Sequence, residues 1–140
     1  MWHNEDILND CVFCRLAKGE LPAWVVFENE HVICFLPQEV EAYGHTIIAP
    51  KAHHSDLFST PADVLGQVLA VAQKVAMHYR QAIGAAGVNL LHASGAAAQQ
   101  SVPHLHIHLI PRFENDGLHA WPVLPGTQAS RDELLQRLHL

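Results

Sequence analysis

Apolar residues and histidines alternate strictly over residues 104–109, in the last third of the chain. Alternation with a period of two is typical of a β-strand, whose side chains point to opposite faces in turn. The pattern places three imidazoles on one face and Leu105, Ile107 and Leu109 on the other, toward the core. Local strand propensity does not favour three histidines at this spacing, so this segment is the first candidate for chemistry.

A long amphipathic helix is predicted in the middle of the chain. Thr60 is expected to be its N-cap, with Pro61 in the first turn and Asp63 in the capping-box position. The helix is expected to end near Gly84. Its apolar face is wide enough to serve both a sheet and a partner subunit.

Shorter patterns predict the remaining elements. Four further strands are expected at residues 25–28, 31–36, 46–49 and 88–92. Short helices are expected at residues 11–18 and 130–138. Strands joined by hairpins or long returns around one main helix indicate an α+β fold. We expect an antiparallel sheet of about five strands, one long helix and short N- and C-terminal helices.

Length and composition favour one domain over residues 1–140, because 49% of the residues are apolar. The net charge of −6 with neutral histidines argues against a nucleic-acid partner. No apolar run approaches the ~20 residues of a membrane span. Residues 1–6 lack the basic region of a signal peptide. We therefore expect a cytoplasmic protein without a membrane partner.

The cysteines suggest metal chemistry. Cys11 and Cys14 form a CxxC pair, which is typical of half a zinc site, of a redox dithiol, or of a chance pair on a buried helix. No βαβ unit surrounds the pair, which argues against a thioredoxin-like dithiol. Structural zinc takes four tetrahedral ligands, and histidine is the usual complement to cysteine. The histidine candidates are His45, His53, His54 and the three strand histidines, and spacing does not choose among them.

The third cysteine and the loop before the histidines have simpler interpretations. Cys34 lies in an apolar strand and is expected to be a plain buried thiol. Residues 95–103 are rich in small residues, which let a backbone come close to a ligand, and Gln and Ser there can donate to phosphate oxygens. A neutral imidazole can attack phosphorus when its other nitrogen is held by an acceptor.

Several stretches, in this order and spacing, resemble the histidine triad (HIT) family of nucleotide hydrolases and transferases. They are Cys11-Val-Phe-Cys14, Gly19-Glu-Leu-Pro22, Gly44-His45-Thr46, Pro50-Lys51-Ala-His53, Gln100-Ser101-Val102 and His104-Leu-His-Ile-His-Leu-Ile110. The resemblance covers a core region of residues 11–112 and leaves a C-terminal tail, residues 113–140. It implies a HIT-like antiparallel sheet, usually in a homodimer.

The resemblance also implies roles for residues of the site. His106 would be the nucleophile on the α-phosphorus of a nucleoside phosphate or phosphoramidate, and water would resolve the nucleotidyl-histidine intermediate. His108 would contact the phosphate and assist proton transfer to the leaving group. Gln100 and Ser101 would hold phosphate oxygens, and His45 matches a histidine near the triad.

The zinc-bearing branch of the family implies a ligand set. Its four structural ligands correspond to Cys11, Cys14, His53 and His104, which leaves no open position for a catalytic water. His54 is then expected at the surface. By the same matching, the pocket for a base is lined by Val12, Phe13, Leu16 and Phe35. Ordinary core packing is the alternative interpretation of these four side chains.

The chain departs from the family pattern at several positions. Pro37 stands where the family usually has an aspartate that binds the ribose hydroxyls, and Ala93 and Gln99 replace a usual Asn and Gly. Tyr43 also replaces the residue usually found before the glycine of Pro-Gly-His. These changes predict intact histidine chemistry with relaxed ribose recognition, or a substrate that is not an ordinary ribonucleotide.

The sequence leaves alternatives open for the role of the C-terminal tail and for the class of function. Phe113, His119 and Trp121 belong to a segment that could cover the site or reach a partner subunit, and the alternative is that Trp121 packs on the core. We expect a nucleotide phosphohydrolase or nucleotidyl transferase acting through His106. A nucleotide-binding regulator with little catalysis is the alternative, and a metalloenzyme that uses the triad as ligands is a third class.

Overall fold

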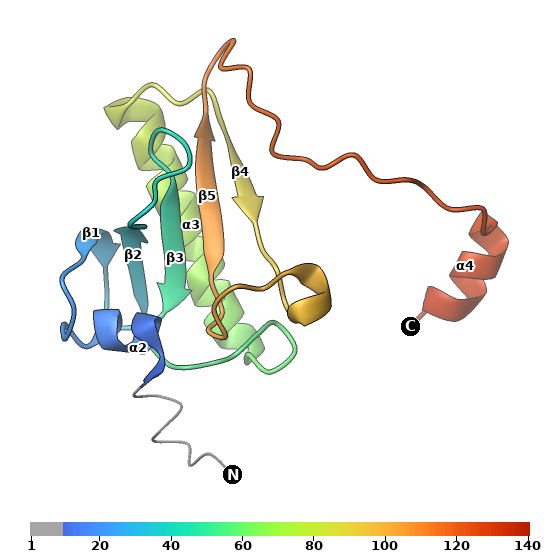
Figure 1. The fold of residues 1–140 in the computed structure, drawn as a ribbon, viewed down its shortest axis with the longest axis horizontal. Helices are drawn as coiled ribbons and strands as arrows, with labels where there is room; N and C mark the ends of the chain where they lie inside the picture. Colours follow the sequence, from blue (N-terminus) through green and yellow to red (C-terminus); the bar gives the residue numbers. More distant parts are fainter. Residues whose placement is uncertain (1–9) are drawn as a thin grey trace.

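The computed structural model describes residues 10–140, so the interpretation of residues 1–6 lies outside it. Its elements are α2 (Val12–Ala17), β1 (Trp24–Glu28), β2 (Val32–Leu36), β3 (Thr46–Pro50), α3 (Ala62–Ala82), β4 (Gly87–Leu91), η1 (Ala96–Ala98), β5 (Ile107–Arg112) and α4 (Arg131–Leu138). The expected α+β fold, with one long helix and two short ones, is confirmed (Figure 1). Within the described part, no helix is long and apolar enough to cross a membrane.

The strands form one antiparallel sheet in the order β1-β2-β3-β5-β4. The strand that carries the last triad histidine is therefore internal, since β5 pairs with both β3 and β4. His108 stands opposite Ile47 on one side and Leu91 on the other. Both edges of β5 are hydrogen-bonded there, so the backbone at His108 is held rigidly.

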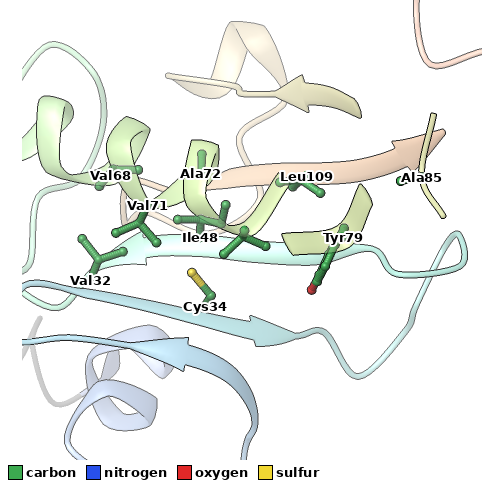
Figure 2. Packing of buried hydrophobic residues seen from close by; sticks show 10 residues of the cluster. Val32, Cys34, Ile48, Val68, Val71, Ala72, Tyr79, Ala85 and Leu109 are labelled. Atoms are coloured by element: carbon green, nitrogen blue, oxygen red, sulfur yellow. The ribbon is translucent and has the colours of Figure 1, made fainter. Parts of the chain in front are cut away.

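Alternating residues of the strands build two cores, one on each face of the sheet. Val32 and Cys34 pack with α3 in the first core, where Val68, Val71, Ala72 and Val75 supply the helical side (Figure 2). Ile33 and Phe35 face the other way and pack with Phe13, Cys11 and Cys14 at α2. Cys34 is fully buried among aliphatic side chains, and this burial raises the pKa of its thiol to about 12.

The start of α3 differs from the prediction. Pro61, not Thr60, occupies the N-cap position, and no side chain caps the helix. The Thr60 hydroxyl instead donates to the carbonyl of Asp56 at 2.5 Å, inside the preceding turn. The helix ends as predicted, because Ile83 is the C-cap and Gly84 follows with a φ of +72°.

Several strand boundaries also differ from the prediction. His31 lies in the turn before β2, because the side chain of Asn29 accepts from the N–H groups of His31 and Val32. β5 begins at Ile107, so His104 and His106 precede the regular strand. β4 ends at Leu91, one residue before the predicted end, and leaves His92 outside the ladder.

The C-terminal tail leaves the body of the molecule after β5. Arg112 stabilises the first turn of the tail by donating to both carboxylate oxygens of Asp116, at 3.0 and 2.8 Å. Farther on, Trp121 is 78% exposed, so the alternative interpretation, that it packs on the core, is wrong. Figure 1 shows α4 set apart from the sheet at the end of an extended segment. The short α4 is capped by Ser130, whose hydroxyl accepts from the N–H of Glu133 at 3.1 Å.

Candidate active site and metal centre

The three histidines of the alternating segment lie on the α2 side of the sheet but in different surroundings. His104 is completely buried, His106 is 6% exposed and His108 is half-buried. The rings of His106 and His108 are 5.0 Å apart between centroids, and Phe13 of α2 packs edge-on against His106 at 5.0 Å. Leu109 faces the opposite core under α3. The alternation therefore separates the imidazoles from the aliphatic side chains, as the sequence predicts.

The ring of His106 has a defined tautomer. Its Nδ1 lies 2.7 Å from the carbonyl oxygen of His104, and a carbonyl only accepts, so Nδ1 carries the proton. Burial lowers the pKa of His106 below its usual value, which keeps the ring neutral at pH 7. Nε2 then has a free lone pair, as a nucleophile requires.

His45 and His108 form a second ordered pair. The backbone N–H of Glu41 donates to Nδ1 of His45 at 3.3 Å, so Nε2 of His45 carries that ring's proton. This proton is directed at Nδ1 of His108, 2.9 Å away, which leaves the proton of His108 on its Nε2. Burial, with His106 and His45 close by, lowers the pKa of His108 to about 4. The pair therefore presents a neutral N–H donor beside His106.

One histidine at the site was not singled out from the sequence. Nδ1 of His92 is 2.8 Å from the carbonyl oxygen of His106, and Nε2 of His92 is 2.6 Å from Oγ of Ser94. No motif marks His92 in the sequence. The sequence offered one indication: His92 is the last residue of the strand predicted at residues 88–92, just before the loop that leads to the histidine segment.

The loop before the triad is organised by Gln100. Its Oε1 accepts from the N–H of Gly95 at 2.8 Å, and its Nε2 donates to the carbonyls of Ser55 and Val102 at 2.6 and 2.9 Å. Both amide hydrogens are thus engaged with backbone, so Gln100 shapes the loop in this structure. Ser101 is exposed at the same turn. Phosphate binding by Gln100 and Ser101 stays a prediction.

Gln99 occupies an unfavourable backbone conformation in this loop. Its φ of +66° lies in the left-handed region that glycine adopts without penalty. This conformation explains why the family pattern usually has glycine at this position. Ala93, the other departure in the loop, offers no side-chain donor.

An apolar cavity of about 480 Å³ lies between α2 and the first two strands. The four side chains named as a candidate base pocket, Val12, Phe13, Leu16 and Phe35, all line it. Its other lining residues are Leu21, Pro22, Ala23, Trp24, Leu36, Pro37, Gln38 and Ile47. None of these lining residues is charged, so the cavity suits a flat apolar group.

A compact Cys/His cluster lies beside the triad. The ligand atoms of Cys11, Cys14, His53 and His104 all lie within 4.8 Å of one another, and this set could hold a metal ion. Sγ of Cys11 is 3.3 Å from Nδ1 of His104, and Sγ of Cys14 is 3.3 Å from Nδ1 of His53. Tetrahedral zinc would separate sulfur and nitrogen ligands by about 3.6 Å, so the donor set and its spacing fit.

The surroundings of the cluster also fit a cation. Nε2 of His104 donates to the carbonyl of Pro50 at 2.8 Å, which directs the unprotonated Nδ1 at the sulfurs. Burial and the neighbouring Cys11 raise the pKa of the Cys14 thiol to about 12, so its thiolate form needs a cation nearby. His54 is outside the cluster, and its backbone carbonyl accepts a hydrogen bond from the N–H of Leu105. It is half-buried, not at the surface as expected.

The fold and the site together define a small α+β protein with a histidine-based centre beside a Cys/His metal-type cluster. A family model described as the HIT domain matches residues 18–115, which is more than half of the chain. The chain therefore belongs to the HIT family. The match begins after α2, so both cysteines of the cluster lie before it.

Individual relatives agree with this assignment. The chain is 38% identical over 112 residues to an adenylylsulfatase of Arabidopsis thaliana, covering 80% of this chain and 57% of that protein. It is 34% identical over 131 residues to an adenosine 5′-monophosphoramidase of Saccharomyces cerevisiae, covering 92% and 78%. A zinc-bound histidine triad protein from Mycobacterium smegmatis matches with a TM-score of 0.77 and 35% identity, covering 81% and 82%.

Proposed function

We propose that this protein is a nucleotide phosphohydrolase or nucleotidyl transferase that attacks the α-phosphorus of a nucleoside phosphate or phosphoramidate through His106. The observation that carries the proposal is the 2.7 Å bond from Nδ1 of His106 to the carbonyl of His104. It fixes the tautomer in which Nε2 is the nucleophile, in a buried site that keeps the ring neutral. The activities named for the Arabidopsis and yeast relatives support this substrate class.

The chemistry proceeds in two balanced steps. Nε2 of His106 forms a bond to phosphorus while the P–N or P–O bond to the leaving group breaks. The leaving group takes a proton from water, and the neutral ring of His108 assists by donating a hydrogen bond from its Nε2 to the phosphate or to the leaving group. Water then attacks the nucleotidyl-histidine, the bond between phosphorus and nitrogen breaks, and the neutral ring of His106 is restored. The proton of the attacking water passes to solvent. The hydrogen bond from His45 orients the Nε2–H of His108 as a donor in both steps.

The nucleoside end of the substrate would occupy the cavity between α2 and the first strands. Phe13 connects the two places, because it lines this cavity and packs on the ring of His106 at 5.0 Å. Val12, Leu16 and Phe35 would contact the base, while Ser101 and Gln100 would stand near the phosphate. The same side chains also belong to the core under α2, so they serve both purposes.

We also propose that the Cys/His cluster holds a structural zinc ion. Four protein ligands fill its coordination, so zinc would join α2, the segment after β3 and the triad segment without taking part in catalysis. The zinc-bound relative from Mycobacterium smegmatis supports the choice of metal. This arrangement disfavours a catalytic metal on the triad. Nδ1 of His104 points to the cluster and Nε2 of His108 carries that ring's proton, so only His106 has a free lone pair.

A homodimer in the cytoplasm completes the proposal. Leu69 and Met77 of α3 are 56% and 62% exposed, and Leu90 of β4, which lines the same hollow as Leu69, is 41% exposed. A hollow of about 520 Å³ runs between these two elements. Such a face suits a second copy of the chain. The cysteines Cys11, Cys14 and Cys34 form no disulfide, as is usual in a reducing compartment.

A nucleotide-binding regulator with little catalysis is the second candidate. Two observations favour it: the amide hydrogens of Gln100 are both bonded to backbone, and Pro37 brings no carboxylate to the cavity. Calorimetry with AMP beside a turnover assay distinguishes the two functions. Tight binding without turnover supports the regulator.

Replacement of the nucleophile tests the proposed activity. His106→Ala is expected to keep the fold and the metal but to abolish turnover of an adenylyl substrate. The matched control is His31→Ala, at an exposed histidine in the turn before β2 whose charged contact is Glu30. Turnover that is unchanged in His106→Ala would contradict the proposal.

A further inference from the structure

The backbone carbonyl of His106 lies beyond the end of the β4–β5 ladder. The last ladder pair joins Leu91 to His108, so His106, two residues earlier in the chain, has no strand partner on that side. The ring of His92 takes this place, with Nδ1 2.8 Å from the carbonyl oxygen. A side chain therefore replaces a ladder hydrogen bond at the residue that carries the nucleophile.

With one proton on the ring of His92, the contacts assign a direction to each hydrogen bond. The N–H of Leu57 donates to Oγ of Ser94 at 2.8 Å. Oγ of Ser94, 2.6 Å from Nε2 of His92, then donates its own proton there, because Nδ1 of His92 must carry the ring's proton to reach a carbonyl. A chain of three hydrogen bonds thus connects the loop before α3 to the backbone of His106.

We propose that His92 is a positioning residue for the nucleophile, an inference that rests on the proposed function. Two hydrogen bonds hold His106: its ring bonds to the carbonyl of His104, and its own carbonyl is bonded by His92. Together they fix where Nε2 stands relative to phosphorus. A misplacement of about 1 Å at a reacting atom can cost on the order of 10²-fold in rate, so this second contact affects the chemical step.

The exposure of His92 separates this role from a role in stability. His92 is on the surface, so removal of its ring lets water reach the carbonyl of His106 and leaves no buried orphan acceptor. The free energy of unfolding should therefore change little. Binding of substrate should also change little, because the ring of His92 faces backbone and Ser94.

Three variants of His92 test the proposal. Asn places an amide N–H near the position of Nδ1 and can still donate to the carbonyl, whereas Gln places its amide near the position of Nε2 and Phe keeps only the ring. We expect His92→Asn to retain kcat within about threefold, and His92→Gln and His92→Phe to lose about tenfold in kcat with KM nearly unchanged. Ser94→Ala should show a smaller loss, and it replaces the His92 series if those variants do not fold. The matched control is His31→Phe.

The outcomes separate the two claims. Wild-type kcat in His92→Phe, or equal losses in the Asn and Phe variants, would overturn the role of His92 while the activity stands. A change in KM alone would overturn it as well. Absence of turnover in the wild-type protein, measured beside His106→Ala, would contradict the proposed function and the inference with it.

Discussion

Gly44 provides a sharp test of how the loop before β3 is packed against β5. Its φ is +79°, and a Cβ atom added there would lie 2.8 Å from Cγ of Pro111 and 3.2 Å from Cδ1 of Ile83. Pro111 is fully buried and stands opposite Val88 of β4 in the sheet, so it cannot withdraw easily. Gly44→Ala is therefore expected to strain both the backbone and the packing.

The magnitude follows from two separate penalties. A non-glycine residue in the left-handed region costs about 1–2 kcal/mol. Overpacking against a rigid neighbour costs about 1–3 kcal/mol. The variant should lose about 2–5 kcal/mol of the free energy of unfolding. Gly84→Ala is the matched control, because Gly84 has a φ of +72° but nothing within 4 Å of its added Cβ.

Urea unfolding followed by circular dichroism, at one protein concentration, measures both variants. Gly84→Ala should lose only the backbone penalty of about 1–2 kcal/mol, and Gly44→Ala clearly more. Equal losses in the two variants would refute the close contact with Pro111. A loss in Gly44→Ala with a changed slope in urea would indicate a change in the unfolded or native ensemble instead.

Three further predictions concern the site. Gln99→Gly should raise the free energy of unfolding by about 0.5–1 kcal/mol in urea unfolding, because it removes left-handed strain at an entropic cost; a loss would contradict this. Cys14→Ser should release about one equivalent of metal by mass spectrometry and lower the melting temperature, whereas Cys34→Ser should keep the metal; full retention in Cys14→Ser would refute the cluster. In an NMR titration the ring of His108, whose pKa burial lowers to about 4, should stay neutral at pH 6. Because the unfolded chain protonates near about 6.5, the stability that His108 contributes is complete above that pH and is lost as the pH falls toward 4; a midpoint near 6.5 would contradict it.

The fold could be predicted from the sequence because its patterns are local. Period-two alternation and the wide apolar face of one helix are set by near neighbours in the chain, and they predicted the sheet and α3 correctly. The predicted element boundaries were wrong where a side chain makes a hydrogen bond that local patterns do not predict. The Thr60 hydroxyl donates to the carbonyl of Asp56 instead of capping α3, and the Asn29 side chain accepts from the N–H of His31, which places His31 in a turn.

The site also has a part that the sequence predicted and a part that it did not. The resemblance to a family indicated Cys11, Cys14, His53 and His104 together, and the structure places their ligand atoms within 4.8 Å. His92 carried no such signal, because its contact with the carbonyl of His106 depends on where β4 ends relative to β5. Contacts of this kind are set by tertiary register, which no local pattern encodes.

The most direct measurement of the central claim is a mass analysis of the chain during turnover. The protein is mixed with an adenylyl substrate, quenched in alkali within milliseconds, digested and analysed by mass spectrometry. The proposed chemistry predicts one nucleotidyl group on the peptide that contains His106, and no such adduct in His106→Ala. Steady turnover by a chain that carries no nucleotidyl group, or a nucleotidyl group on another residue, would contradict it.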